Sequence, residues 1–526
     1  MRVAITSALV LAIFGQLGGA VTLQSSNLKA NATRADAVRA LYQSSFANYL
    51  KYAKGADELL PLSKKPQNNF LGGWGATMVD SISTSRFMNL TDYATLAEDW
   101  MINNVDYTKT AEKSISLFET TIRHVAGLVS AYELGGQTKK GLIKQATILA
   151  DILLRAWNGT DVPYNTLVNW GPTTARPDDS SKTASAGIAE AGTLILEFDR
   201  LSKYSGNASY KAFARRAEDA LVRSRGQFPG LRYQEYFTHY LNGSRQLTPN
   251  TTFTSLGGGS DSFYEYLLKY PLLLGNTKSS YLGTWVTGTK SAIKYLVQSP
   301  RGHDSTFFLA DADARTILPE YSHLACYAPG NILLGGKALG NDQLVQWGLK
   351  LAQGCIDTYR ATGSGIGPEQ WTYILKDGST NGVSYTDDAF SQQHGFSISS
   401  ADYVLRPEVL ESMFYAYRIT GDQRWADYAW DAFLAIQAHY TTPDGSLAAT
   451  KDVRPSNPKL IDNEQSFVYA ETFKYLYMTF ADPSIGSLDR YVFNTEAHPF
   501  LRENAGADFT TVTVGTVPTP LMQSHV

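Results

Sequence analysis

The apolar residues of this 526-residue chain recur mostly at the spacing of amphipathic helices. Ala37, Leu41, Phe46 and Tyr49 follow one another at intervals of three to five residues, which places them on one helix face. Strand-like alternation is sparse and is confined to long connecting segments such as 371–374. The pattern therefore predicts an all-α protein with small β elements in its loops.

The helical segments repeat loosely, and each repeat ends in a glycine-containing turn. These turns lie at residues 132–136, 204–207, 274–276, 339–342 and 419–422. Glycine suits the position just after a helix, and the Asn or Asp that follows most of these glycines suits the start of the next helix. The interval of roughly 65–80 residues accommodates two helices and a loop. With the less regular ends near Asn89 and Ala481, we expect about seven hairpins in a closed ring, with the long loops at one end.

The two ends of the chain lack this repeat. Arg2 is followed by an apolar run from Val3 to Leu17 and by small residues, as is typical of a secretory signal peptide. A type II membrane anchor is the alternative, although no later run reaches the roughly 18 apolar residues that a membrane-spanning helix needs. The expected division is a signal peptide at 1–20, a linker at 21–36, a helical domain at 37–500 and an irregular tail at 501–526.

Composition and short motifs fit the secretory route. The net charge of −3 gives no reason to expect nucleic acid as a partner. Cys326 and Cys355 are the only cysteines; in an oxidising compartment they would pair, and two free buried thiols are the alternative. Six sequons predict glycosylation at Asn31, Asn89, Asn158, Asn207, Asn242 and Asn250.

One charged cluster stands at the start of a predicted helix. Arg406, Glu408 and Glu411 lie among apolar residues, with Pro407 suited to the first helical turn. Glu408 and Glu411 are three positions apart and share a helix face. Charges in such surroundings are costly unless they are paired or used. The alternative is a simple charge cluster that complements the helix dipole.

Four further acidic clusters occur in separate repeats. They contain Glu119 with Arg123, Asp261 with Glu265, Glu471 in an apolar helix, and the oxygen-rich turn at 493–499. Each alone is explained by a surface or buried ion pair. In a ring of hairpins, however, the helix ends could converge on one cavity. A cavity lined by carboxylates suits glycoside hydrolysis, which needs an acid and a base, and also a hard cation such as Ca²⁺.

Taken together and in order, these segments resemble glycoside hydrolase family 47, the class I α-1,2-mannosidases, and the chain is most similar to secreted fungal members. The resemblance runs from about Asp57 to Pro499. It implies an (α/α)7 catalytic barrel and Ca²⁺-dependent, inverting hydrolysis of terminal α-1,2-linked mannose from high-mannose N-glycans. We expect a monomer without stable membrane insertion, secreted or in the Golgi lumen.

The resemblance also implies roles for individual residues. Glu408 matches the general base, and Glu119 and Asp261 match the two candidates for the general acid. Thr495 matches the direct protein ligand of Ca²⁺, with the remaining positions filled by waters. The other matching positions, which contact substrate or hold those waters, are Arg123, Glu265, His323, Arg406, Glu411, Phe467 and Glu471. For His323, a structural core histidine is the alternative. Cys326 and Cys355 match the family's disulfide.

Two positions depart from the family pattern. Asp80 and Thr84 are kept in an early motif, but Ser83 replaces a second Asp that is frequent in relatives, which changes local hydrogen bonding. Gly259 stands where relatives carry Arg or Leu, and we expect a roomier cavity there and trimming beyond a single mannose. Two other functions stay open: a mannose-glycan-binding relative with little turnover, and a helical-barrel carbohydrate enzyme with six hairpins.

Overall fold

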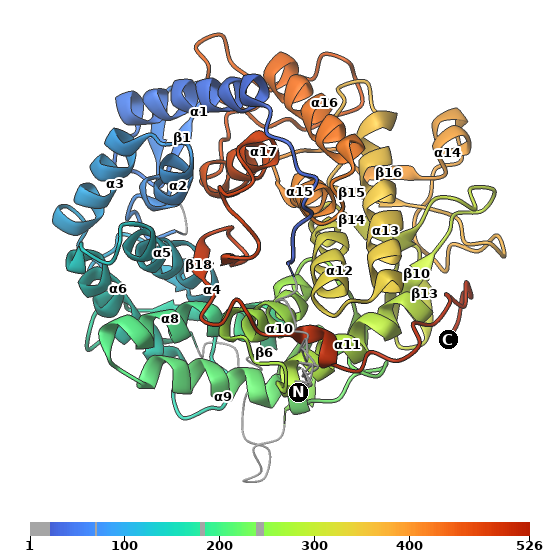
Figure 1. Cartoon of the computed structure of the whole chain (residues 1–526), viewed down its shortest axis with the longest axis horizontal. Helices are drawn as coiled ribbons and strands as arrows, with labels where there is room; N and C mark the ends of the chain where they lie inside the picture. The colour runs from blue at the N-terminus through green and yellow to red at the C-terminus, as the bar shows by residue number, and fades with distance from the viewer. Residues whose placement is uncertain (1–21, 69–70, 179–184, 238–246) are drawn as a thin grey trace, which may run out of the picture.

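A computed structural model describes residues 22–68, 71–178, 185–237 and 247–526, and its helices form two concentric rings (Figure 1). In this described part, seven helices form each ring. The inner helices are α2 (Ala76–Phe87), α5 (Ala126–Leu134), α8 (Ile195–Ser205), α10 (Asp261–Leu274), α12 (Tyr327–Ala338), α15 (Glu408–Thr420) and α17 (Phe473–Phe480). The outer helices are α1 (Ala32–Tyr52), α3 (Thr91–Asn103), α6 (Lys140–Leu153), α9 (Ser209–Arg223), α11 (Ser280–Ser291), α13 (Asp342–Ala361) and α16 (Gln423–His439). Each inner helix from α2 to α15 packs against the outer helix that follows it in the chain. The last inner helix, α17, packs against α1, which closes an (α/α)7 barrel.

Short helical segments precede several inner helices. Those that bear on the pocket are α4 (Leu117–Thr120) and η1 (Thr121–Val125) before α5, α7 (Ile188–Gly192) before α8, η4 (Leu324–Cys326) before α12, and η5 (Val468–Thr472) before α17. The others are η2 (Leu154–Trp157), η3 (Ala292–Leu296), α14 (Ala389–His394) and η6 (Phe509–Thr511). Segments η1 and η5 are π-helical turns, which occur frequently at functional sites.

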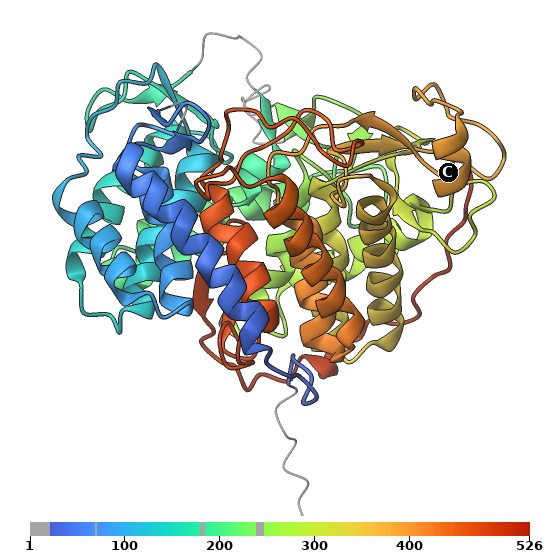
Figure 2. The same ribbon diagram turned by 90° about the horizontal axis from the view of Figure 1, so that it is seen from above.

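Small antiparallel sheets occupy the long loops, most of them at one end of the barrel (Figure 2). The two-stranded sheets are β1 (Glu58–Leu60) with β2 (Lys65–Gln67), β10 (Val297–Gln298) with β11 (Phe308–Leu309), and β17 (Tyr491–Phe493) with β18 (Pro499–Leu501). The three-stranded sheets are β3 (Ser114–Ser116), β4 (Thr166–Val168) and β5 (Arg176–Pro177); β6 (Ser185–Gly187), β7 (Glu235–Phe237) and β8 (Thr248–Pro249); β9 (Phe253–Thr254), β12 (Asp311–Asp313) and β13 (Thr316–Leu318); and β14 (Glu320–Ser322), β15 (Gln370–Thr372) and β16 (Ser397–Ser400).

The two rings differ in the pattern of their side chains. In the inner helix α2 every residue except Arg86 is buried. In the outer helix α9, by contrast, the buried residues Tyr210, Ala214, Ala217 and Leu221 recur at intervals of three to four and form one face. A helix that is enclosed on all sides loses its amphipathic period, whereas an outer helix keeps it. The core therefore lies between the rings and around the inner helices.

The turns that join an inner helix to the outer helix after it follow the predicted chemistry. Gly206, Gly275 and Gly421 end helices α8, α10 and α15 with φ of +77°, +67° and +71°, a conformation that favours glycine. The side chains of Asn341 and Asp422 then accept hydrogen bonds from backbone N–H groups in the first turns of α13 and α16.

The boundaries at the N-terminal end differ from expectation. Helix α1 begins at Ala32, inside the segment expected to be a linker, because the Asn31 side chain caps it by accepting from the N–H of Arg34. Before the helix, Leu23 is buried and Ser25 donates its N–H to the carbonyl of Arg418. Residues from 22 onward are thus packed on the barrel. The expected signal peptide, 1–20, lies outside the described residues.

The C-terminal tail is largely irregular and lies along the barrel surface. Lys290 on α11 donates to the carbonyl of Val514, and Asn381 donates to the carbonyl of Ser524. His525 forms an isolated antiparallel β-bridge with Thr316 on β13. Among the described residues no helix is both long and apolar enough to span a membrane.

Candidate active site

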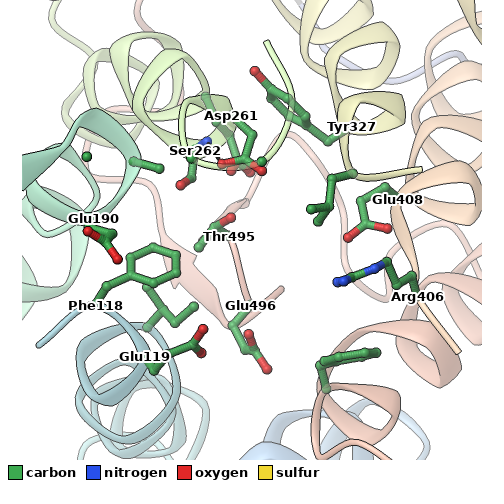
Figure 3. Close-up of a pocket in the computed structure, with 18 of the residues that line it drawn as sticks. Phe118, Glu119, Glu190, Asp261, Ser262, Tyr327, Arg406, Glu408, Thr495 and Glu496 are labelled. Carbon is green, nitrogen blue, oxygen red and sulfur yellow. Dashed lines mark hydrogen bonds between the residues drawn. The ribbon is translucent and has the colours of Figure 1, made fainter. Parts of the chain in front are cut away.

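A cavity of about 500 Å³ lies at the centre of the inner ring. Its lining comes from the N-terminal ends of inner helices, from the short segments and loops before them, and from the turn between β17 and β18 (Figure 3). The residues expected to act directly, Glu119, Asp261, Glu408 and Thr495, all line this one cavity although they are far apart in the sequence. Also in the lining are Arg123, Glu265, Arg406, Glu411, Phe467 and Glu471.

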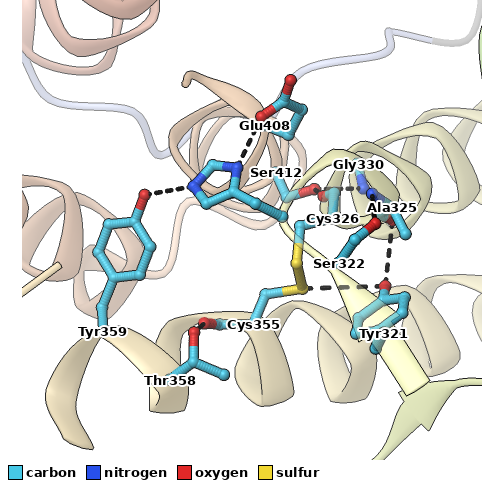
Figure 4. Close-up of a disulfide and its surroundings, with 11 residues drawn as sticks. Tyr321, Ser322, Ala325, Cys326, Gly330, Cys355, Thr358, Tyr359, Glu408 and Ser412 are labelled. Atoms are coloured by element: carbon cyan, nitrogen blue, oxygen red, sulfur yellow. Dashed lines mark hydrogen bonds and ion pairs between the residues drawn. A yellow bond between two sulfur atoms is a disulfide. The ribbon is translucent and has the colours of Figure 1, made fainter. Parts of the chain in front are cut away.

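His323 is placed just behind the pocket wall. It is fully buried, and its Nδ1 lies 2.6 Å from Oε2 of Glu408, while its Nε2 lies 2.7 Å from the hydroxyl of Tyr359 (Figure 4). Burial opposes ionisation of Glu408, but the hydrogen bond and charge of His323, together with the charge of Arg406, outweigh it and lower the pKa of Glu408. Glu408 is therefore held as a carboxylate.

The disulfide joins the chain next to His323 to the outer ring. Cys326, at the end of η4, is bonded to Cys355 on α13, as expected for the pair. Ser412 on α15 donates to the carbonyl oxygen of Cys326 and accepts from the N–H of Gly330 (Figure 4). The segment that carries His323 is thus fastened on two sides.

Arg406 is paired with a carboxylate that the sequence reasoning missed. Its Nε lies 2.6 and 2.8 Å from the two carboxylate oxygens of Glu369. Glu369 precedes β15 by one residue and has no acidic neighbour in the sequence, so no local pattern marks it. The pair holds the guanidinium beside Glu408 at the pocket wall.

The opposite wall is organised by a buried guanidinium. Arg123, in the π-helical turn η1, donates from Nε to Glu119 at 2.9 Å and from Nη1 to Ser466 and Glu496 at 3.0 and 2.5 Å. Its Cζ lies 5.8 Å from the centroid of the Phe467 ring. Arg123 therefore orients two carboxylates of the pocket and one aromatic face.

Asp261 is the first residue of α10 and lies in a less favourable environment for charge. Burial, with added repulsion from Glu265 and Glu408, raises the pKa of Asp261 to about 7. Glu265 is itself paired with the buried Lys269, whose Nζ also lies 3.8 Å from Glu411. In the part of the chain that the structure describes, no cation forms an ion pair with Asp261, and its carboxyl group can hold a proton near neutral pH.

The turn that carries Thr495 is tightly supported. The backbone N–H of Thr495 donates to the hydroxyl of Tyr266 at 3.2 Å. The Asn494 side chain accepts from the N–H groups of Glu496 and His498 at 3.1 and 2.7 Å. Lys474 donates to the carbonyl of Ala497 at 2.6 Å. These contacts fix the hydroxyl and carbonyl of Thr495 at the cavity.

The sequence profile of the family described as "Glycosyl hydrolase family 47" matches residues 41–502. The chain belongs to this family. A mannosyl-oligosaccharide alpha-1,2-mannosidase of Coccidioides posadasii is 37% identical over 91% of this chain and 92% of its own length. The corresponding enzyme 1B of Aspergillus phoenicis is 35% identical over 93% and 95%. The structure of the alpha-1,2-mannosidase from Trichoderma reesei superposes with a TM-score of 0.84 at 33% identity, covering 90% of this chain and 100% of that one.

The donor set of this family 47 pocket fits a hard cation. Among the described residues no three His, Cys, Asp or Glu side chains are grouped closely enough to hold a metal directly. Around Thr495, however, burial and neighbouring carboxylates raise the pKa of Glu471 and Glu496 well above their ordinary values, and burial raises that of Glu411 to about 8. The donors are all oxygens, which suits Ca²⁺ with water ligands.

The family 47 pocket also contains side chains that the sequence did not single out. Glu190, on α7, accepts from the Asn165 side chain at 2.6 Å, and burial raises its pKa. Gln234, just before β7, and Glu235, its first residue, line the same wall. These residues lie in or beside elements of only three to five residues, which are too short to show a periodic pattern, so nothing in the local sequence identifies them. Phe118 and Tyr327, which also line the pocket, could be read equally well as core residues.

Proposed function

We propose that this protein removes terminal α-1,2-linked mannose from high-mannose N-glycans by inverting hydrolysis. The observation that carries the proposal is that Glu119, Asp261, Glu408 and Thr495 line one cavity in a family 47 barrel. The relatives named mannosyl-oligosaccharide alpha-1,2-mannosidase, which align over nine tenths of the chain, support the same substrate.

The two sides of the pocket support complementary proton transfers. Glu408, whose pKa is lowered, acts as general base on a water molecule. The general acid protonates the leaving oxygen from the other side of the sugar, as inverting glycosidases require. Asp261, with a pKa raised to about 7, is one candidate for this acid. Glu119, held by Arg123, is the other, and it would deliver the proton directly or through water.

Substrate binding would use the remaining lining residues. Phe467 offers an aromatic face to the sugar ring, and Arg123 and Arg406 orient the carboxylates around it. Thr495 would hold Ca²⁺ through its hydroxyl and carbonyl oxygens, with waters held by the nearby carboxylates Glu265, Glu411, Glu471 and Glu496. A bound cation would supply a ligand for sugar hydroxyls and water.

We also propose the setting in which the protein works. Residues 1–20 would direct it into the secretory pathway, as a secreted or Golgi-lumenal monomer whose catalytic domain begins with α1 and extends to about residue 500. The described sequon residues Asn31, Asn89, Asn158, Asn207 and Asn250 are exposed, as glycosylation requires. The sixth, Asn242, lies outside the described residues.

One experiment tests the activity and the cation together. Purified protein, stripped with a chelator and then reloaded with Ca²⁺, is assayed for mannose release from mannose-α-1,2-mannose and from a nine-mannose glycan. We expect release only after reloading, and a loss of several orders of magnitude in kcat for Glu408→Gln with unchanged unfolding temperature. Glycan binding without release by the reloaded wild type would favour the binding-protein alternative. Release without any added cation would contradict the role of Ca²⁺.

A further inference from the structure

The pocket wall near Asp261 contains an amide whose orientation is defined by its partner. Gln234 lines the cavity and is half-buried, and its Nε2 donates to the carbonyl oxygen of Gly258 at 2.6 Å. A carbonyl oxygen only accepts, so the amide nitrogen faces Gly258 and Oε1 remains as a hydrogen-bond acceptor. Within the described ranges of the chain no donor reaches this oxygen.

The backbone of Gln234 is fixed from both sides. Its N–H donates to the carbonyl of Phe253 at 2.9 Å, and its carbonyl accepts from Ile188 at 2.9 Å. The neighbouring Gly259 carbonyl accepts from Ala189 at 3.1 Å. Three chain segments therefore build this wall, and the Gln234 side chain projects from a rigid support.

Gln234 takes up the space that a side chain at position 259 would need. A Cβ atom on Gly259 would lie 2.5 Å from Nε2 of Gln234 and 3.1 Å from its Cδ. The φ of Gly259, +84°, also favours glycine on backbone grounds alone. The expected extra room at Gly259 is thus occupied in part, and the limit on pocket width passes to Gln234.

The position of Gln234 indicates which part of a substrate it meets. The residues proposed for catalysis belong to inner helices, to α4 just before one of them, or to the turn at Thr495. Gln234 instead belongs to a loop, and its hydrogen bond to Gly258 is exposed to solvent. A terminal sugar enters such a pocket first, and the rest of the glycan remains on the side nearer to solvent. Sugar hydroxyls can donate hydrogen bonds, and an unpaired amide oxygen can accept one of them.

We infer that Gln234 is a specificity-determining residue, whose Oε1 binds a hydroxyl of a mannose beyond the two sugars at the scissile bond and whose side chain limits the branches that fit. The inference rests on the proposed function and names a determinant of its preference among branches. It also assigns Gly259 a different role, which is to make room for the Gln234 side chain.

The test compares two substrates in the same preparations of the Ca²⁺-loaded protein. Wild type, Gln234→Ala and Gln234→Met are assayed on mannose-α-1,2-mannose and on a nine-mannose glycan, and the eight-mannose isomers are separated. Methionine keeps the length of the side chain without the acceptor, whereas alanine removes both. The control is Gln392→Ala, an exposed glutamine on α14 that donates to Asp387 and lies outside the pocket lining.

We expect both variants to lower the ratio of kcat/KM on the glycan to kcat/KM on the disaccharide by about two- to twelvefold, the effect of one neutral hydrogen bond. We also expect Gln234→Ala, but not Gln392→Ala, to change the proportions of the eight-mannose isomers. An unchanged ratio in both variants, or equal losses on both substrates, would overturn the inference. A wild type that releases mannose from neither substrate would instead contradict the proposed function.

Discussion

The contact between His323 and Glu408 gives a quantitative prediction about the pH dependence of turnover. Replacing His323 by Leu removes the 2.6 Å hydrogen bond to Glu408 and leaves a half-buried carboxylate with less compensation. Because His323 lowers the pKa of Glu408 in the wild type, its removal raises that pKa. The general base that we propose Glu408 to be acts only when ionised, so we expect activity to be lost at the acidic end of the profile.

The expected size follows from the geometry. A buried hydrogen bond to a charged group contributes about 1.5–3 kcal/mol, and one pKa unit corresponds to about 1.4 kcal/mol. The acidic limb of the kcat/KM profile should therefore move to higher pH by about 1–2 units in His323→Leu. His323→Gln can still donate a neutral hydrogen bond to Glu408, and we expect a smaller shift in the same direction.

The assay is mannose release from mannose-α-1,2-mannose across the acidic to neutral range, with circular dichroism at each pH to confirm folding. Tyr359→Phe is the matched control, because it removes the 2.7 Å hydrogen bond on the far side of the imidazole and leaves the contact with Glu408. An acidic limb in His323→Leu that coincides with that of the wild type would refute the assignment of His323 as the positioning residue of Glu408.

Two further predictions concern stability. Glu218 on α9 is buried, and among the described residues both of its carboxylate oxygens are unpaired. Burial raises its pKa well above the ordinary value, so folding favours the protonated form. The stability of the fold therefore falls as the pH rises above the pKa that Glu218 has in the unfolded chain. Glu218→Gln should therefore raise the free energy of unfolding by more than about 1 kcal/mol at pH 8 and by little at pH 4, as measured by urea titration, and a pH-independent difference would contradict this. Arg418 is buried, with a pKa lowered by burial to about 10, and donates to the carbonyls of Pro483, Met478 and Ile485 and to the Gln24 side chain. Arg418→Met should lower the free energy of unfolding by about 3–5 kcal/mol, and a loss below about 1 kcal/mol would mean that water replaces the guanidinium.

The ring of hairpins could be predicted because its turns are local in the sequence. Gly206, Gly275 and Gly421 end α8, α10 and α15 with positive φ, and Asn341 and Asp422 cap α13 and α16, so these boundaries are encoded within a few residues. The helical domain was expected to begin at residue 37, five residues after the observed start of α1 at Ala32. Its cap by Asn31 could have been recognised, but the preceding residues are ordered by contacts with a distant part of the chain, such as the carbonyl of Arg418.

The pocket could be predicted only in part, for a related reason. Glu119, Asp261, Glu408 and Glu471 stand out because carboxylates in apolar helical segments are unusual, and resemblance supplied their roles. Glu369 and Gln234 gave no such signal. Their importance comes from partners that only the fold brings together, Arg406 for the first and the Gly258 carbonyl for the second.

The architecture also explains how two similar carboxyl groups come to differ. Asp261 and Glu408 are each the first residue of an inner helix, where the helix dipole favours negative charge. The dipole alone would treat them alike. Burial raises the pKa of both groups, but at Glu408 the hydrogen bond and charge of His323, with the charge of Arg406, outweigh it, whereas at Asp261 the carboxylates of Glu265 and Glu408 add to it. The contrast between a carboxyl group that can hold a proton and one that is ionised therefore depends less on the two residues than on which neighbouring hairpins the ring places beside them.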